Sequence, residues 1–156
     1  MTSDNWDQAQ LRSVIASALA PFQQQRFVLD GPDISLNASR SLHMTLALHE
    51  LATNASKHGS LSGQAGRVDL TWSVTRTQQG LTLVLDWKES RGPAPKRNRR
   101  PGFGSRLINM VIERQLNGQV QQSFAPEGME ARMIVPLTHE RWPGGLVRSF
   151  PDAPER

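Results

Sequence analysis

One segment of the chain carries side chains suited to magnesium and phosphate chemistry. The sequence predicts a helix over about residues 38–57, ending near Gly59. Because successive helical residues turn by about 100°, Glu50, Asn54 and Lys57 fall on one stripe about 60° wide. Carboxylate and amide oxygens suit a hard cation such as Mg²⁺, and an ammonium group suits phosphate oxygens. An ordinary solvated helix face is an equally open interpretation of this stripe alone.

The same helix does not predict a zinc site. His49-Glu50 begins like the H-E-x-x-H motif, but Thr53 occupies the position of the second histidine ligand. His43, six residues before His49, faces a different side of the helix. The chain also contains no cysteine, which excludes disulfides, thiolate metal sites and a cysteine nucleophile.

Two further groups of residues follow this helix. A predicted strand over residues 81–89 ends in Asp86-Trp87-Lys88-Glu89, and a basic loop comes next. Gly102-Phe103-Gly104-Ser105-Arg106-Leu107-Ile108 then opens a predicted helix. Glycines allow close approach of the backbone to a ligand, and a helix N-terminus offers free N–H groups to an anion. Two glycines alone usually mark only a turn, and the third glycine of the dinucleotide fingerprint is missing.

The predicted elements define the fold class. Hydrophobic periodicity and turn residues predict helices and strands over residues 6–19, 27–29, 34–36, 38–57, 67–75, 81–89, 104–116, 120–124 and 129–135. The first, fourth and seventh of these are helices, and Asn37 or Ser39 is the expected cap of the fourth. This order predicts an α+β, two-layer α/β sandwich with a mixed, mostly antiparallel sheet and helices on one face.

Length and charge restrict the class of protein further. We expect one domain over residues 1–137, with a lead-in helix in 1–20, and a C-terminal tail over 138–156. The formal net charge is +4, and most of the excess lies between residues 88 and 106. A local cluster suits a phosphate ligand better than a nucleic-acid track. No long apolar run predicts a membrane span, so we expect a cytoplasmic segment without direct membrane contact.

The order of these motifs resembles the catalytic, ATP-binding domain of sensor histidine kinases in the GHKL ATPase superfamily. The closest resemblance is to the HWE subfamily, which is named for a histidine in the N box and a Trp-x-Glu motif in the first glycine box. Here the N box runs from His49 to Gly59, Trp87-Lys88-Glu89 follows it, and the second glycine box begins at Gly102. The resemblance covers about residues 6–137 and implies a Bergerat-type fold, ATP and Mg²⁺ as cofactors, and protein histidine kinase activity.

The resemblance implies a role for each motif residue. Asn54 would bind the Mg²⁺ that bridges the ATP phosphates, and Glu50 would lie beside the γ-phosphate as the second catalytic residue. Lys57 would contact phosphate or ribose oxygens. Glu89 would replace the aspartate that accepts a hydrogen bond from the adenine amino group. The further nucleotide contacts implied are His49, Trp87, Arg91, Gly92, Gly102, Phe103, Gly104, Ser105, Arg106 and Leu107. His49 points about 100° away from Glu50, which favours a packing role for it.

Two departures from the family pattern leave an alternative open. Arg91 stands where the family has a glycine after Trp-x-Glu, so either the chain shifts by one residue or Arg91 reaches toward the ligand. The final hairpin, at 128–132, also lacks the threonine or serine that relatives place near the base. The alternative function is a degenerate nucleotide-binding fold that acts as a non-catalytic protein-interaction module.

The acceptor of the phosphoryl group is expected elsewhere. The four histidines, at positions 43, 49, 58 and 139, include none in a separate helical hairpin. We therefore expect a piece of a larger two-component sensor kinase, or a stand-alone ATP-binding module. The γ-phosphoryl group would go to a histidine on a dimerisation/phosphoacceptor domain, with a response regulator downstream. A serine-phosphorylating relative is less favoured because it lacks Trp-Lys-Glu, and nucleic-acid binding is less favoured still.

Overall fold

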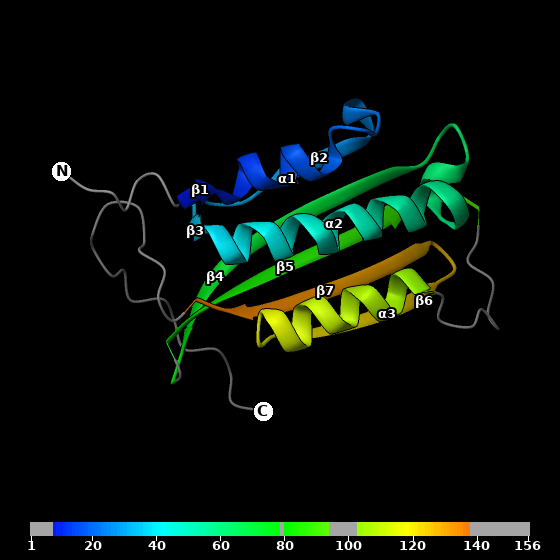
Figure 1. Ribbon diagram of the computed structural model, residues 1–156. Coiled ribbons are helices and arrows are strands. Elements are labelled where there is room, and N and C mark those ends of the chain that lie inside the picture. Colours follow the sequence, from blue (N-terminus) through cyan, green and yellow to red (C-terminus); the bar gives the residue numbers. More distant parts are fainter. Residues whose placement is uncertain (1–7, 79, 94–102, 138–156) are drawn as a thin grey trace.

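A computed structural model describes residues 8–78, 80–93 and 103–137, and it shows two layers (Figure 1). A five-stranded sheet has the order β2-β4-β5-β7-β6, in which only the β2–β4 pair is parallel. Its strands are β2 (Phe27–Asp30), β4 (Arg67–Thr77), β5 (Gly80–Ser90), β6 (Gln119–Ala125) and β7 (Gly128–Pro136). The helices α1 (Leu11–Leu19), α2 (Ala38–His58) and α3 (Phe103–Met110) cover one face (Figure 1). The predicted fold class is confirmed.

The beginning of the chain differs from the prediction. Residues Gln8–Gln10 form a short strand, β1, which pairs antiparallel with β3 (Ser35–Asn37) in a separate two-stranded sheet. The helix predicted over 6–19 therefore begins only at Leu11, whose N–H donates to the carbonyl of Ile34 at 2.7 Å. Pairing with a distant strand overrides the local helical periodicity here. The two strands predicted around residues 27–36 are present, but they belong to different sheets.

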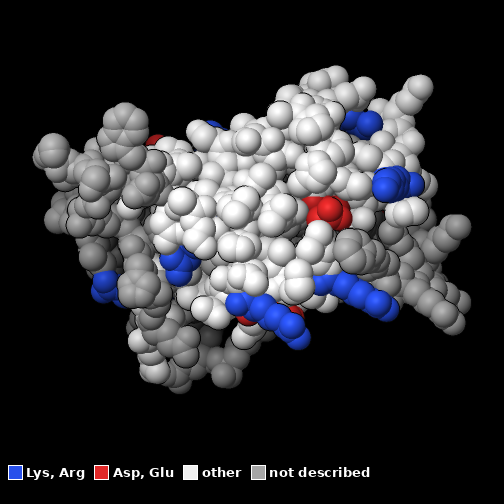
Figure 2. Space-filling view, in the orientation of Figure 1, with Lys and Arg blue, Asp and Glu red and all other residues white. Residues whose placement is uncertain are grey.

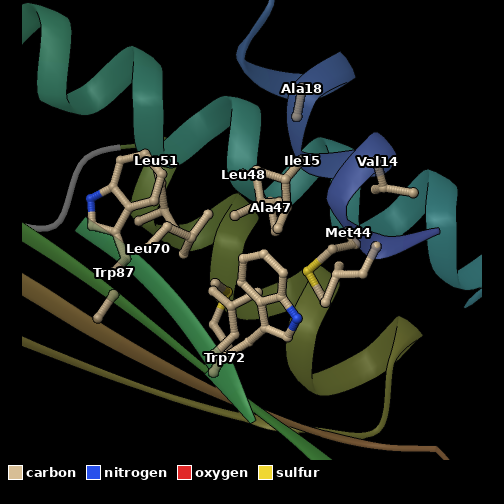
Figure 3. Packing of buried hydrophobic residues seen from close by; sticks show 14 of the residues in the cluster. Val14, Ile15, Ala18, Met44, Ala47, Leu48, Leu51, Leu70, Trp72 and Trp87 are labelled. Carbon is tan, nitrogen blue, oxygen red and sulfur yellow. The ribbon is translucent and has the colours of Figure 1, made fainter. Parts of the chain in front are cut away.

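Helix α2 forms as the sequence predicts. Asn37, one of the two expected caps, accepts a hydrogen bond from the Arg40 N–H at 2.8 Å. The residues of its buried stripe face the sheet and pack against Trp72, Trp87 and α1 (Figure 3). This stripe comprises Met44, Ala47, Leu48, Leu51, Ala52 and Ala55. Complete burial of a leucine side chain contributes about 1.5–3 kcal/mol. Rotating α2 would expose several such side chains, so the stripe determines which face of the helix turns away from the sheet.

The last helix ends differently from a regular α-helix. Helix α3 continues into a π-helical turn, η4 (Val111–Gln115), and the chain then reverses at Asn117, which has a φ of 53°. A Cβ at Gly118 would lie 2.2 Å from the Ile134 carbonyl oxygen, so only glycine fits where the chain enters the predicted hairpin. No helix in the described part of the chain is both long enough and apolar enough to cross a bilayer.

One arginine holds the loop that follows α2. Arg26 lies in a short 3₁₀ turn, η2 (Gln24–Arg26), directly before β2. Its guanidinium donates to the carbonyl oxygens of Gly66 at 2.8 Å, Leu61 at 3.3 Å and Ser60 at 3.5 Å, and also to that of Gly63. The loop contains the 3₁₀ turn η3 (Ser60–Ser62). Arg26 therefore satisfies several backbone acceptors that no regular element pairs.

We expect Arg26→Lys to lower the free energy of unfolding by about 2 kcal/mol, because an ammonium group cannot reach the carbonyls that the planar fork serves together. Arg12→Lys is the matched control, since Arg12 donates to one carbonyl, that of Gly31, at 3.0 Å. Urea unfolding followed by circular dichroism measures both. Equal losses for the two variants would contradict the proposed clamp.

Candidate functional site

A carboxylate lies among the apolar side chains on the helix-facing side of the sheet. Strand pairing places Val68 of β4 opposite Glu89 of β5. On the other side of β5, Met129 of β7 lies opposite Phe124 of β6. Glu89 is 2% exposed and, among the residues that the structure describes, it is the only charged side chain in the buried set. A buried charge is costly unless hydrogen bonds compensate it, so this position requires an explanation.

The Glu89 carboxylate accepts hydrogen bonds from donors in two parts of the fold. The Ser60 N–H donates to Oε1 at 2.9 Å, and the Trp87 indole N–H donates to Oε2 at 3.0 Å. Gly59 is required beside them, because a Cβ there would lie 2.3 Å from Glu89 Oε1. The loop that Arg26 clamps thus presents a backbone donor to this carboxylate, and the first residue of the Trp-Lys-Glu motif presents a side-chain donor. The two interactions fix the orientation of the carboxylate.

A pocket opens at this carboxylate, between α2 with its following loop on one side and the β6–β7 hairpin on the other. It is lined by Asn54, His58, Gly59, Ser60, Glu89, Pro93, Gln122, Phe124, Gly128 and Met129. The pocket is narrow, because the centres of water-sized groups can reach only about 30 Å³ of it. A ligand as large as a purine therefore requires movement of the pocket walls.

The structure brings together only part of the predicted helical stripe and strand end. Asn54 and Glu89 line the same pocket, although they lie far apart in the sequence. Glu50 is half-buried one turn before Asn54 on α2 and lies outside the pocket lining, and Lys57 is exposed and also lies outside it. The carboxylate and the amide oxygen predicted to act together on α2 thus do not share the described pocket.

His49 lies on another side of α2. Its ring centroid is 5.7 Å from that of Phe22, at an interplanar angle of 58°, and it does not line the pocket. This placement agrees with the packing role that the helical geometry favours. It does not support the nucleotide contact that the family resemblance implied for His49.

Arg91 has a backbone conformation that usually favours glycine. Its φ of 60° lies in the left-handed region, which glycine adopts more readily than other residues. The Arg91 side chain is exposed and is not part of the pocket lining. Gly92 serves packing, because a Cβ there would lie 2.2 Å from the Ser60 Cα. The first glycine box thus supports the loop that donates to Glu89.

The second glycine box is described in part. Gly102 lies outside the described residues, and of Phe103, Gly104 and Ser105 only the backbone, at the start of α3, is described. Arg106 is exposed, and Leu107 is partly buried against the core. Trp87, from the first box, is completely buried.

The sequence analysis did not single out the two β6 residues of the hairpin that line the pocket. Gln122 and Phe124 alternate with outward-facing residues on β6, and cross-strand pairing puts Phe124 beside Met129. Their shared face was predictable from this alternation. Their position opposite Asn54 and His58 was not, because it depends on how α2 packs on the sheet.

A larger hollow, of about 510 Å³, lies on the sheet face that the helices leave uncovered. Four of its charged side chains pair with one another across β5 and β7, and the fifth, Asp69, pairs with Arg67 on β4 at 3.1 Å. Arg132 donates to both oxygens of Asp86, at 2.8 and 3.2 Å, and Lys88 lies 3.7 Å from Glu130. The Asp86 carboxylate raises the pKa of Arg132 above its ordinary value through this hydrogen bond and charge attraction. These charges compensate each other, so we assign the candidate site to the narrow pocket.

We expect Trp87→Phe to lower the free energy of unfolding by about 2–3 kcal/mol, because it removes a donor from a buried carboxylate. Trp72→Phe is the matched control: Trp72 is 5% exposed, and its indole N–H donates to the neutral Pro32 carbonyl at 2.7 Å. Its loss should be about 1 kcal/mol smaller. Urea unfolding measures both variants. A smaller loss of unfolding free energy for Trp87→Phe than for Trp72→Phe would contradict the claim that the buried Glu89 carboxylate needs the indole donor.

Comparison with known proteins identifies the family. Residues 6–135 match the histidine kinase-like ATPase domain. The blue-light-activated histidine kinases of Brucella ovis and Brucella anthropi are each 33% identical to the chain, over 147 and 143 residues, or 92% and 90% of it. The chain spans only 30% and 29% of the length of these relatives.

Solved structures show the same fold at lower sequence identity. The catalytic domain of the histidine kinase ThkA has a TM-score of 0.65 at 16% identity, with 83% of this chain and 94% of that chain covered. The histidine kinase domain of the Erythrobacter litoralis EL346 blue-light-activated kinase has a TM-score of 0.61 at 13% identity, with 82% and 59% covered. Together with the match over residues 6–135, these findings show that the chain belongs to the family of histidine kinase-like ATPase domains.

Proposed function

We propose that this domain binds ATP with Mg²⁺ as the catalytic part of an HWE-type sensor histidine kinase. The γ-phosphoryl group of ATP is transferred to a histidine on a separate dimerisation/phosphoacceptor domain. The observation that carries the proposal is the buried carboxylate of Glu89, in a pocket that it shares with Asn54 of the N-box helix. Family membership supports the same assignment.

Glu89 serves the purine end of the site. An ionised carboxylate only accepts hydrogen bonds, and adenine carries an exocyclic amino donor where guanine carries a carbonyl acceptor. Ser60 and Trp87 keep the carboxylate oriented, so this selectivity is built into the protein before the ligand arrives. Glu89 therefore favours adenine over guanine nucleotides.

Asn54 serves the phosphate end. Its amide oxygen is a hard ligand, and protein-bound Mg²⁺ commonly has few protein ligands, with nucleotide phosphates and water completing its shell. Within the described residues no group of three or more His, Asp or Glu side chains gathers as a metal site, which fits a cation that arrives with the nucleotide. When bound, Mg²⁺ neutralises charge on the phosphates. Glu50 and Lys57, on the neighbouring turns of α2, are proposed to orient the reacting groups and to contact phosphate or ribose oxygens.

The acceptor histidine is proposed to lie on another part of a larger kinase. The described histidines, His43, His49 and His58, all belong to α2 and do not form a separate acceptor helix. Among the structural neighbours, ThkA has been solved in complex with the response regulator protein TrrA. By analogy, a cytoplasmic response regulator is the proposed downstream partner. Positioning and charge neutralisation, rather than covalent chemistry by this domain, would provide catalysis.

The charge distribution on the described surface is consistent with this assignment. On the face formed by the helices, Lys and Arg side chains lie apart from one another and do not form a continuous band (Figure 2). A nucleic-acid track usually extends over a face as a connected basic surface. The described part of this face therefore does not favour nucleic acid as the partner.

We expect ATP with Mg²⁺ to raise the melting temperature of the domain by several degrees, because a ligand that binds only the native state stabilises it. Asn54→Ala should remove most of the difference in melting temperature between the domain with ATP and Mg²⁺ and the domain with ATP and EDTA. Thr53→Ala, on the adjacent position of α2 and outside the pocket, is the control and should keep it. Differential scanning fluorimetry provides the measurement, and an unchanged melting curve for the wild type would contradict nucleotide binding.

The narrowness of the pocket favours, as a second candidate, a non-catalytic interaction module. Incubation of the domain with a purified phosphoacceptor domain and γ-labelled ATP separates the two. Transfer of label that requires both Glu50 and Asn54 excludes the module. Absence of transfer from a domain that binds ATP would support it.

Arg91 offers an independent test, because its side chain lies outside the pocket and its backbone is left-handed. We expect Arg91→Gly to leave the Kd for ATP within about twofold and to raise the free energy of unfolding by up to about 1 kcal/mol. Lys88→Gly, in the extended strand β5, should instead lower it by about 1 kcal/mol. Calorimetric titration and urea unfolding measure these changes. A large gain in ATP affinity on Arg91→Gly would show that Arg91 obstructs the site.

A further inference from the structure

We propose that Phe124 forms the aromatic wall of the purine slot and stacks on the face of the base. This inference rests on the proposed nucleotide binding and adds a residue that lies outside the family motifs. Phe124 is 46% exposed, which is unusual for a large aromatic side chain. Of the exposed large hydrophobic residues in the described part of the chain, it is the one that lines the pocket with Glu89 and Asn54.

Strand geometry places Phe124 at the open side of the slot. It lies on β6, the edge strand of the sheet, directly opposite Met129 of β7. Met129 is 7% exposed, so it forms the closed floor beside which the Phe124 ring stands. Glu89 lies on β5, the strand next to β7. The carboxylate, the thioether and the ring therefore follow one another across three adjacent strands.

The chemistry of the three groups is complementary. A carboxylate meets a base at its hydrogen-bonding edge, in the plane of the ring, whereas an aromatic side chain meets its face. Stacking of a base on an aromatic ring contributes roughly 5- to 150-fold in affinity and depends little on the identity of the base. Phe124 thus supplies affinity, and Glu89 supplies the choice of base.

Because the pocket is narrow, we also infer that the Phe124 side chain moves to admit the base. The opposite wall is held in place, because the Ser60 N–H donates to Glu89 and the space between Gly59 and this carboxylate leaves no room even for a Cβ. Among the lining residues, Phe124 is the one large hydrophobic side chain that is exposed, and it has a neighbouring strand on one side only. Rotation of its ring would widen the slot and leave the carboxylate in place.

The test is calorimetric titration of the whole domain with Mg²⁺-ATP and Mg²⁺-GTP. We expect Phe124→Ala to weaken ATP binding about tenfold or more, Phe124→Leu to weaken it nearly as much, and Phe124→Trp to preserve it. The ratio of ATP to GTP affinity should stay within about twofold of the wild-type ratio, because stacking does not distinguish the bases. Val28→Ala is the matched control, since Val28 is 42% exposed on β2, the opposite edge strand.

The outcomes separate this inference from the proposed function. If the wild type and Phe124→Ala bind ATP equally, Phe124 is no stacking wall, although nucleotide binding stands. If Phe124→Leu binds like the wild type, a general apolar contact replaces stacking and the inference is overturned. If the wild type binds no nucleotide, both proposals fail together. The melting temperature without nucleotide should change by less than about 3 °C in each Phe124 variant, which shows that lost affinity is not lost folding.

Discussion

The candidate site depends on one buried interaction, the Glu89 carboxylate held between the Ser60 N–H and the Trp87 indole N–H. A charge among apolar side chains reduces stability unless donors compensate it, and these donors come from two different parts of the fold. Gly59 and Gly92 then have a structural reason, because a Cβ at either position would collide with Glu89 or with Ser60. These two glycines thus make room for the carboxylate and for the residue that donates to it.

The same interaction connects the site to distant parts of the chain. Arg26, before β2, donates to the carbonyl oxygens of the loop that contains Ser60. That loop follows α2, whose buried stripe against the sheet determines where Asn54 lies relative to Glu89. The position of the Asn54 amide relative to the Glu89 carboxylate therefore depends on how the helices pack on the sheet.

Local patterns in the sequence predicted most of the fold. Alternating residues predicted β4 and β5, helical spacing and Asn37 predicted α2, and Asn117-Gly118 predicted the end of the last helix. The failures have a common physical cause. The pairing of Gln8–Gln10 with β3, the clamp of Arg26 and the position of Phe124 opposite α2 are tertiary contacts, which no local pattern encodes. That Glu50 acts together with Asn54 stays a prediction, because the lining of the described pocket includes Asn54 but not Glu50.

The central claim is that the buried carboxylate binds the purine while the N-box amide faces the phosphates. A crystal structure of the domain with Mg²⁺ and a non-hydrolysable ATP analogue tests it most directly. The account predicts the adenine amino nitrogen at about 3 Å from the Glu89 carboxylate, with Asn54 on the side of the metal. An analogue bound on the uncovered face of the sheet, or with its base turned away from Glu89, would contradict it.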